Sequence, residues 1–270
     1  YKQAWWCGAF PSISGDRISY AEDNGSGWSS ASIVLSPSDT WAGTNGLIAD
    51  PSVIKGNFTY NATNYSYAMY FTGTTHGLPT DPDNGQYNRT GVAFSNNGIS
   101  WVVYPNYIIA PEGSEATLKW GAGMPSAYRD STGTIWLVYL DSTAGTGNKI
   151  RLRKSTDGIN FSSPLATQLD NPDGTHSGQQ GPDIAYDPAI NKWYAVTKEG
   201  LDTVVSVWRT KNTGLDGITG SWELIGQIDQ SKTRQVKNHN AGFYHLANGD
   251  IYAESTSDKR YIAFGCGYGE

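Results

Sequence analysis

Apolar and aromatic residues occur in short runs along the chain, and Gly- or Asn-containing turns separate these runs. No long segment has a helical period, so the runs predict antiparallel β-strands joined by tight turns. Five segments repeat one pattern, an opening motif followed by a turn and an aromatic-rich strand. They are FPSISGDRISYAED from Phe10, DPSVIKGNFTYNATNYSYAMYFTGT from Asp50, MPSAYRDSTGTIWLVYLDST from Met124, GPDIAYDPAINKWYAVTKEG from Gly181 and HNAGFYHLANGDIYAES from His239.

A second type of hairpin follows several of these segments. Ser95–Trp101 and Ser155–Phe161 are near copies of one another, and Gly220–Trp222 resembles a decayed third copy. Strand pairs that recur at the spacing of propeller blades predict a five-bladed β-propeller, formed by residues 1–270 as a single domain. We expect N-terminal strand material (Ala4–Phe10) to complete the last blade beside Tyr261–Gly269.

Two cysteines, Cys7 and Cys266, lie near opposite ends of the chain, where a propeller must be closed. We expect them to form a disulfide, and the alternative is a pair of buried free thiols. A disulfide indicates an oxidising compartment. The chain starts at Tyr1 rather than at Met, which fits removal of a leader, so we expect a secreted protein.

Composition narrows the classes of partner. The net charge is −6, only 16% of residues are charged, and no basic run occurs, which argues against binding a nucleic-acid backbone. No apolar stretch has the length of a membrane-spanning helix, so membrane insertion is not expected. The 32 Gly, 17 Tyr and 10 Trp residues are typical of short strands and turns. We expect a monomer.

Propeller geometry would bring two sets of residues to one mouth, because first strands begin there and second strands end there. The inner ring would be Phe10, Asp50, Met124, the pair Gln180–Gly181, and His239. The second ring would be Glu22, Thr72, Asp141, Glu199 and Glu254. Crowded carboxylates raise one another's pKa, which is how a general acid is made, and they could also hold a cation. The alternative is that each is an ordinary solvated strand end.

Aromatic side chains in loops or near strand starts, such as Trp41 and Trp120, are candidates for stacking on sugar rings. Trp136 and Trp193 lie in the middle of strands and are predicted to pack in the core. The sequence has no HExxH, Walker, GxSxG or zinc-type motif.

Several motifs resemble the five-bladed propeller glycoside hydrolases, especially family 43 and its relatives that act on arabinose- and xylose-containing polysaccharides. These motifs are ADPSV from Ala49, MPSAYRDSTGTIWLVY from Met124, QGPDIAYDPAINKWYAV from Gln180, the paired S-x-D/N-G-I-x-W/F hairpins, and NHNAGFYHLANGDIYAES from Asn238. The resemblance implies an Asp general base in the first blade, a second Asp that tunes the acid, a Glu general acid before Gly-Pro, and a His near the axis.

Carried over residue by residue, the resemblance is incomplete. His239 matches the axial His, but Gln180 stands in place of the acidic Glu and Met124 in place of the tuning Asp. Asp50 is the base if ADPSV opens the first blade. If FPSIS opens it, Phe10 occupies that position, and this register counts the blades more evenly. Gln and Met cannot transfer protons as a carboxyl group does.

Three functions follow as hypotheses. The first is a glycoside hydrolase with relocated carboxylates, drawn from Asp50, Asp183, Glu199, Glu254, Asp141 and Glu22. The second is a non-catalytic protein that binds an oligo- or polysaccharide. For either, the candidate binding residues are His239, Gln180, Met124, Phe10, Trp120, Trp41 and Asn240. The third is a structural or adhesion module. No cofactor is required; either a calcium ion or a water, held through His239, would fill the axis.

Overall fold

The computed structural model describes residues 2–10, 13–74, 88–112, 118–143, 147–165, 167, 169, 180–199, 203–235, 238–254 and 259–265. Its regular elements are β-strands with a few single-turn helices. The chain divides into two compact units, each described by itself. The first unit comprises Tyr1–Pro125, Asp141–Gly145 and Ser155–Phe161, and the second comprises Ser126–Leu140, Thr146–Lys154 and Ser162–Glu270. In these described ranges no helix is long and apolar enough to cross a membrane.

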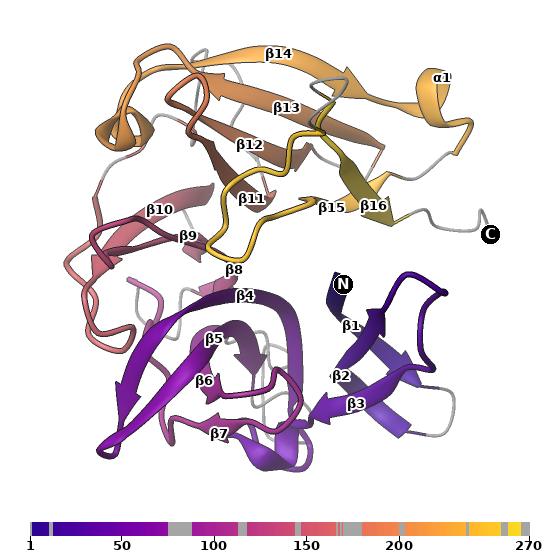
Figure 1. Cartoon of the computed structure of the whole chain (residues 1–270), viewed down its shortest axis with the longest axis vertical. Coiled ribbons are helices and arrows are strands. Elements are labelled where there is room, and N and C mark those ends of the chain that lie inside the picture. The colour runs from indigo at the N-terminus through magenta and orange to yellow at the C-terminus, as the bar shows by residue number, and fades with distance from the viewer. Residues whose placement is uncertain are drawn as a thin grey trace. The chain divides into compact units, whose positions relative to one another are not determined.

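The first unit contains two antiparallel sheets, coloured indigo to magenta in Figure 1. One has the order β1-β2-β3 and the other the order β4-β5-β6-β7. The 3-10 helix η1 (Pro37–Asp39) lies between them in the sequence. The strands are β1 (Lys2–Phe10), β2 (Ile13–Asp23), β3 (Ser32–Leu35), β4 (Leu47–Tyr60), β5 (Thr63–Thr74), β6 (Arg89–Ser95) and β7 (Val102–Val103).

The second unit contains a four-stranded sheet with the order β11-β12-β13-β14 and a two-stranded sheet β15-β16. A fifth sheet, β10-β9-β8, contributes strands to both units. The elements are β8 (Leu118–Arg129), β9 (Ile135–Thr143), β10 (Gly147–Ser155), β11 (Gln180–Asp187), β12 (Lys192–Glu199), β13 (Val204–Thr210), η4 (Leu215–Thr219), β14 (Trp222–Ile228), α1 (Gln230–Thr233), β15 (His239–Phe243) and β16 (Ile262–Gly265).

Three of the predicted strand pairs are confirmed: β4 with β5, β8 with β9, and β11 with β12. The all-β class is confirmed, and separate small antiparallel sheets are consistent with a propeller-like fold. The arrangement of five blades about one axis, in a single domain over residues 1–270, stays a prediction.

The predicted first strand pair is wrong. Phe10 does not open a strand but ends β1, which pairs along its length with β2, Trp5 opposite Tyr20 and Cys7 opposite Ile18. This pairing buries Ile18 and Tyr20 together with Trp5, so the apolar segment before Phe10 finds its partner in the next strand along the chain.

The predicted closure by the two terminal strands is also wrong for the described strands. β1 lies in the β1-β2-β3 sheet, and β16 pairs with β15. The Asn248–Gly249 turn makes only a short hairpin, bridged between His245 and Ile251. Cys7 carries a free thiol, and the predicted Cys7–Cys266 disulfide is not found; Cys266 itself lies outside the described residues.

The two S-x-D/N-G hairpins have the same hydrogen bonds, which explains their near-identical sequences. The Ser155 hydroxyl oxygen accepts from the amide of Gly158 at 2.9 Å, and Asp157 Oδ1 accepts from the amides of Ile159 and Asn160. Ser95 and Asn97 make the equivalent bonds in the other copy. Each turn is therefore built by side chains that replace missing backbone partners.

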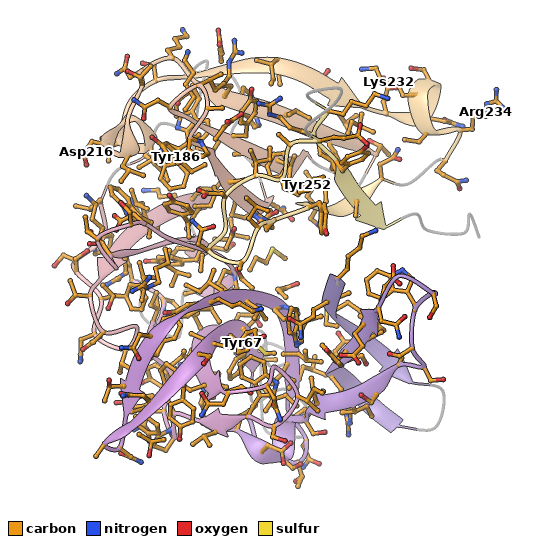
Figure 2. The ribbon with its side chains drawn as sticks, in the orientation of Figure 1. Tyr67, Tyr186, Asp216, Lys232, Arg234 and Tyr252 are labelled. Atoms are coloured by element: carbon orange, nitrogen blue, oxygen red, sulfur yellow. The ribbon has the colours of Figure 1, made fainter. Side chains whose placement is uncertain are left out.

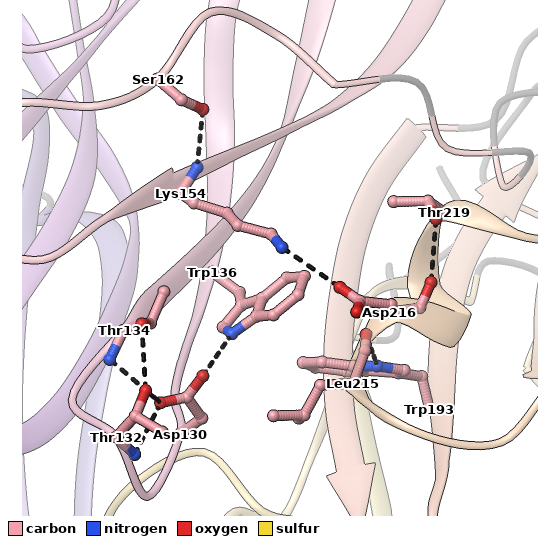
Figure 3. Close-up of polar contacts among 10 residues, drawn as sticks. All are labelled: Asp130, Thr132, Thr134, Trp136, Lys154, Ser162, Trp193, Leu215, Asp216 and Thr219. Carbon is pink, nitrogen blue, oxygen red and sulfur yellow. Dashed lines mark hydrogen bonds and ion pairs between the residues drawn. The ribbon is translucent and has the colours of Figure 1, made fainter.

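The tryptophans predicted to pack in the core are buried, with Trp136 3% and Trp193 0% exposed. Trp136 is anchored by the turn before it, shown in Figure 3. Asp130 Oδ1 accepts from the amides of Thr132 and Thr134, and Asp130 Oδ2 accepts from Trp136 Nε1 at 2.9 Å. Burial opposes ionisation of Asp130, but these donors hold its pKa below the usual range.

Lys154 contacts both the Trp136 ring and Asp216. Its Nζ lies 3.6 Å from the centre of the Trp136 ring and 3.3 Å from Asp216 Oδ1. The Asp216 side chain is 90% exposed and lies at the outer edge of the unit (Figure 2), so this ion pair adds at most about 1 kcal/mol. The contact of the Lys154 ammonium with the buried Trp136 ring contributes more to stability than the ion pair does.

Candidate functional site

The repeated opening motifs have a shared backbone geometry. Asp50, Met124 and Gly181 each precede a proline, and they have φ values of 51°, 53° and 54°. Strand pairing is interrupted there, between Ala49 and Ser52 in β4 and between Gln180 and Asp183 in β11. Left-handed backbone is strained for a non-glycine residue, at about 1–3 kcal/mol each, and such strain clusters at functional sites.

The same interruption identifies the equivalent position in β15. It falls between His239 and Gly242, so Asn240 is the residue of this motif that is equivalent to Asp50 and Gly181. His239 is thus equivalent to Gln180, one residue earlier. Among the openings with proline that the structure describes, Asp50 alone supplies a carboxylate.

Asp50 is held by a chain of hydrogen bonds in the first unit. The Thr72 hydroxyl donates to Asp50 Oδ2 at 2.8 Å, and the amide of Met124 donates to the Thr72 hydroxyl oxygen at 2.7 Å. Thr72 lies in β5 and is 5% exposed. The predicted ring members Asp50, Thr72 and Met124 therefore meet at one place.

Two further side chains complete this group. The pKa of the Cys7 thiol is raised to about 11, mainly by burial and in part by the charges of Asp50 and Asp16. The strand register agrees for Asp16, which lies opposite Ala9, two residues along β1 from Cys7. We call Asp50, Thr72, Met124, Cys7 and Asp16 the Asp50 cluster. The sequence analysis missed Asp16, although the residue directly follows the FPSISG motif.

An aromatic group packs on Gly73, the residue after Thr72 in β5, and includes Arg89, the partner of Gly73 in β6. Gly73 has no side chain, and a Cβ there would lie 2.7 Å from the Trp41 ring, so glycine lets Trp41 pack on the strand. Trp41 and Tyr107 meet edge to face at 5.8 Å, and the Arg89 guanidinium lies 4.9 Å from the centre of the Tyr107 ring. Tyr107 is 45% exposed, which suits a ring that stacks on a ligand.

Asp183, another predicted carboxylate, has a different environment in the second unit. Its Oδ1 accepts from the Ser126 hydroxyl at 2.6 Å, and its Oδ2 accepts from the amide of Phe243 at 2.7 Å. His245 Nε2 lies 2.8 Å from the same Oδ2, while His245 Nδ1 faces the Gly249 carbonyl at 3.1 Å. Because both ring nitrogens face acceptors, both carry hydrogens, and the ring is an imidazolium.

The pKa directions agree with this ion pair. Burial opposes ionisation of Asp183, but the His245 charge and the hydrogen bonds hold its pKa below the usual range. Burial disfavours the imidazolium, but the Asp183 charge raises the His245 pKa overall. Asp183 thus fastens β8, β11 and β15 together, a structural role. His245 was not predicted. The signal that could have found it in the sequence is a histidine two residues after Phe243 in the last opening segment.

Two further predicted carboxylates have other hydrogen-bond partners. Asp141 is 2% exposed and accepts from the amide of Glu112 at 3.1 Å. Glu22 accepts from the Tyr20 hydroxyl at 2.5 Å and lies four residues beyond Ile18, the partner of Cys7. At about 3.3 Å per residue, this places Glu22 about 13 Å along the strand from the level of Cys7.

Glu254 lies in the second unit, where Tyr261 bonds to its carboxylate; burial raises the Tyr261 pKa, and Glu254 raises it further. Of the predicted binding residues, Gln180 pairs with Lys198 across β11 and β12. The side chains of five predicted residues lie outside those that the structure describes: Glu199, Phe10, Trp120, His239 and Asn240.

A metal site is not among the groups that the structure describes. The described residues contain no cluster of three or more His, Cys, Asp or Glu side chains that could hold an ion. The predicted axial ion depends on His239, whose side chain is not described, so that ion stays a prediction.

No protein-family model and no curated relative matches the sequence. Solved structures do match. An exo-β-1,3-galactanase from Phanerochaete chrysosporium aligns with a TM-score of 0.60 and 16% identity over 93% of this chain and 53% of its own. Zg3597, a family 117 glycoside hydrolase from Zobellia galactanivorans, aligns at 0.56 and 16% over 92% of this chain and 69% of its own. A thermostable family 43 glycoside hydrolase aligns at 0.55 and 12% over 100% and 91%.

The predicted resemblance to glycoside hydrolases is thereby confirmed at the level of the fold. The chain spans only about half the length of some matched structures, 53% for the galactanase. Identities this low carry the fold and not the activity. The chain therefore has a glycoside hydrolase-like, propeller-like β fold, whose Asp50 cluster presents a carboxylate at a strained opening motif.

Proposed function

We propose that this protein is a secreted carbohydrate-active protein, a glycoside hydrolase-like propeller whose site is the Asp50 cluster. Its substrate class is a plant- or microbe-type polysaccharide, with arabinose- or xylose-containing chains favoured. The observation that carries the proposal is the Asp50 carboxylate, held by the Thr72 hydroxyl at a strained opening motif. The fold shared with glycoside hydrolases supports it.

The cluster offers the two carboxyl groups that glycoside hydrolysis uses. One activates water or attacks the sugar, and the other protonates the leaving oxygen. We assign the first role to Asp50, because its Oδ2 accepts a hydrogen bond and so favours the ionised form. We assign the second role to Asp16, whose charge acts on the same Cys7 thiol as that of Asp50. The exposed Tyr107 ring would stack on a sugar face while Arg89 orients hydroxyl groups.

The alternative is a glycan-binding propeller without catalysis. A specific observation favours it: Met124 and Gly181 occupy the positions equivalent to Asp50, and Asp183 is engaged in its ion pair. A site with one reactive carboxylate binds hydroxyl groups well but lacks a proton donor for the leaving group.

One experiment separates the two. The purified chain is incubated with a panel of polysaccharides, and released sugar and bound glycan are both measured for wild type, Asp50→Asn, Asp16→Asn and the exposed control Asp216→Asn. A hydrolase loses at least about 100-fold of its sugar release in Asp50→Asn and keeps it in the control. Binding without release establishes the alternative. No release and no binding on any glycan overturns both.

A further inference from the structure

The Thr72 side chain joins two strained opening motifs. Its hydroxyl lies 2.8 Å from Asp50 Oδ2 and 2.7 Å from the amide nitrogen of Met124. The amide can only donate, so the Thr72 oxygen accepts that bond. The single hydroxyl hydrogen then points to the carboxylate. The direction of both bonds is fixed by chemistry alone.

Neighbouring residues leave the hydroxyl little freedom. Thr72 is 5% exposed, and a Cβ on Gly123 would lie 2.8 Å from Thr72 Cγ2 and 2.9 Å from Thr72 Oγ1. The absence of a side chain at Gly123 therefore lets β8 approach β5 closely enough for the Met124 amide to reach Thr72. A threonine whose methyl is packed in this way has one preferred rotamer.

The backbone at both ends of this contact is strained. Asp50 and Met124 have φ values of 51° and 53° before proline, conformations that a chain holds only when its surroundings impose them. A buried hydroxyl bonded to both residues supplies part of that constraint. It also keeps a donor on Asp50 Oδ2, which stabilises the ionised carboxylate.

We propose that Thr72 is a positioning residue that fixes the orientation and charge state of Asp50, with Gly123 required for its placement. This inference rests on the proposed function only for its consequence in catalysis or binding. Asp50 and Asp16 both act on the Cys7 thiol, and Asp16 and Cys7 stay unchanged in the variants below.

The first readout needs no substrate. The carboxyl carbon of Asp50 is followed by NMR titration in the whole chain labelled at aspartate, with Asp50→Asn to assign the signal. Thr72→Val removes the donor and keeps the shape, and we expect the Asp50 midpoint to rise by about one pH unit. Thr72→Ser keeps the hydroxyl and should restore the wild-type midpoint.

Thr72→Val leaves the Met124 amide without a partner and could prevent folding. Gly123→Ala is therefore the second variant, because its new Cβ displaces the hydroxyl without removing it; the Asp50 midpoint should rise here as well. Folding of each variant is checked by thermal unfolding. Midpoints within about 0.2 units of wild type in every variant that folds, or a raised midpoint in Thr72→Ser, overturn the proposal.

The second readout uses the substrate found in the polysaccharide panel. Thr72→Val should lower kcat about 10- to 100-fold with little change in KM, and shift the acid limb of the pH profile upward. Thr72→Ser should restore both. If the Asp50 midpoint rises while kcat is unchanged, Thr72 sets only the charge state of Asp50, and the predicted effect on catalysis is overturned. If no substrate is found, the proposed function fails while the titration still decides the role of Thr72.

Discussion

The Asp183–His245 ion pair gives the sharpest prediction about stability. The two side chains are 18% and 26% exposed, so they are shielded much more than a surface pair. Substituting His245 by Phe keeps a ring packed edge to face against Phe243 and removes both N–H donors. Asp183 then keeps only its bonds from Ser126 and the Phe243 amide.

The size of the effect follows from the degree of burial. Removing one partner costs about 3–5 kcal/mol in a fully buried pair and at most about 1 kcal/mol in an exposed pair. A pair that is about four-fifths buried and retains two donors should lose about 2–4 kcal/mol. In a chain of 270 residues this lowers Tm by about 4–8 °C.

The dependence on pH identifies the cause. The raised pKa of His245 means that its contribution is complete below the unfolded value, about 6.5, and is lost as pH rises through the folded value. The lowered pKa of Asp183 means that its contribution is complete above about 3.9 and is lost as pH falls through the folded value. The pair is therefore strongest between about pH 4 and 6.5.

The assay compares thermal unfolding of wild type and His245→Phe at pH 5.5 and pH 9, followed by tryptophan fluorescence. We expect the difference in Tm to be largest at pH 5.5 and to shrink at pH 9, because wild type loses the imidazolium there. His76→Gln, which removes a different imidazole, is the control for general titration of histidines. Equal differences at the two pH values would refute the assignment of a charged His245.

Two further predictions concern the first unit. Gly91→Ala places a Cβ 2.5 Å from the buried Phe71 ring and should destabilise the chain by about 1–3 kcal/mol in urea unfolding, whereas Gly226→Ala, with open space, should change little; equal effects would contradict the packing. Asp50→Asn removes a charge that acts on Cys7 and should lower the pKa of the thiol from about 11, so alkylation of Cys7 at alkaline pH should be faster. An unchanged dependence of the alkylation rate on pH would show that the Asp50 charge does not act on Cys7.

The sequence pattern determined the parts of the fold that depend on neighbours along the chain. Turn residues and apolar runs located the hairpins β4-β5, β8-β9 and β11-β12, because a tight turn fixes the register of the strands that it joins. The mid-strand positions of Trp136 and Trp193 predicted their burial correctly. The recurring opening motifs were recognised in the sequence, but their shared left-handed backbone at Asp50 and Met124 was not predicted from it.

The tertiary structure decided what depends on partners distant in the sequence. The pairing of β16 with β15, and not with the N-terminal strand, follows from which apolar faces can be buried together, and local pattern does not contain that choice. Carboxylates looked alike in the sequence, yet Asp183 meets an imidazolium whereas Asp50 meets a threonine hydroxyl. An ionisable group takes its role from the charges, donors and solvent around it, and only folding assembles those surroundings.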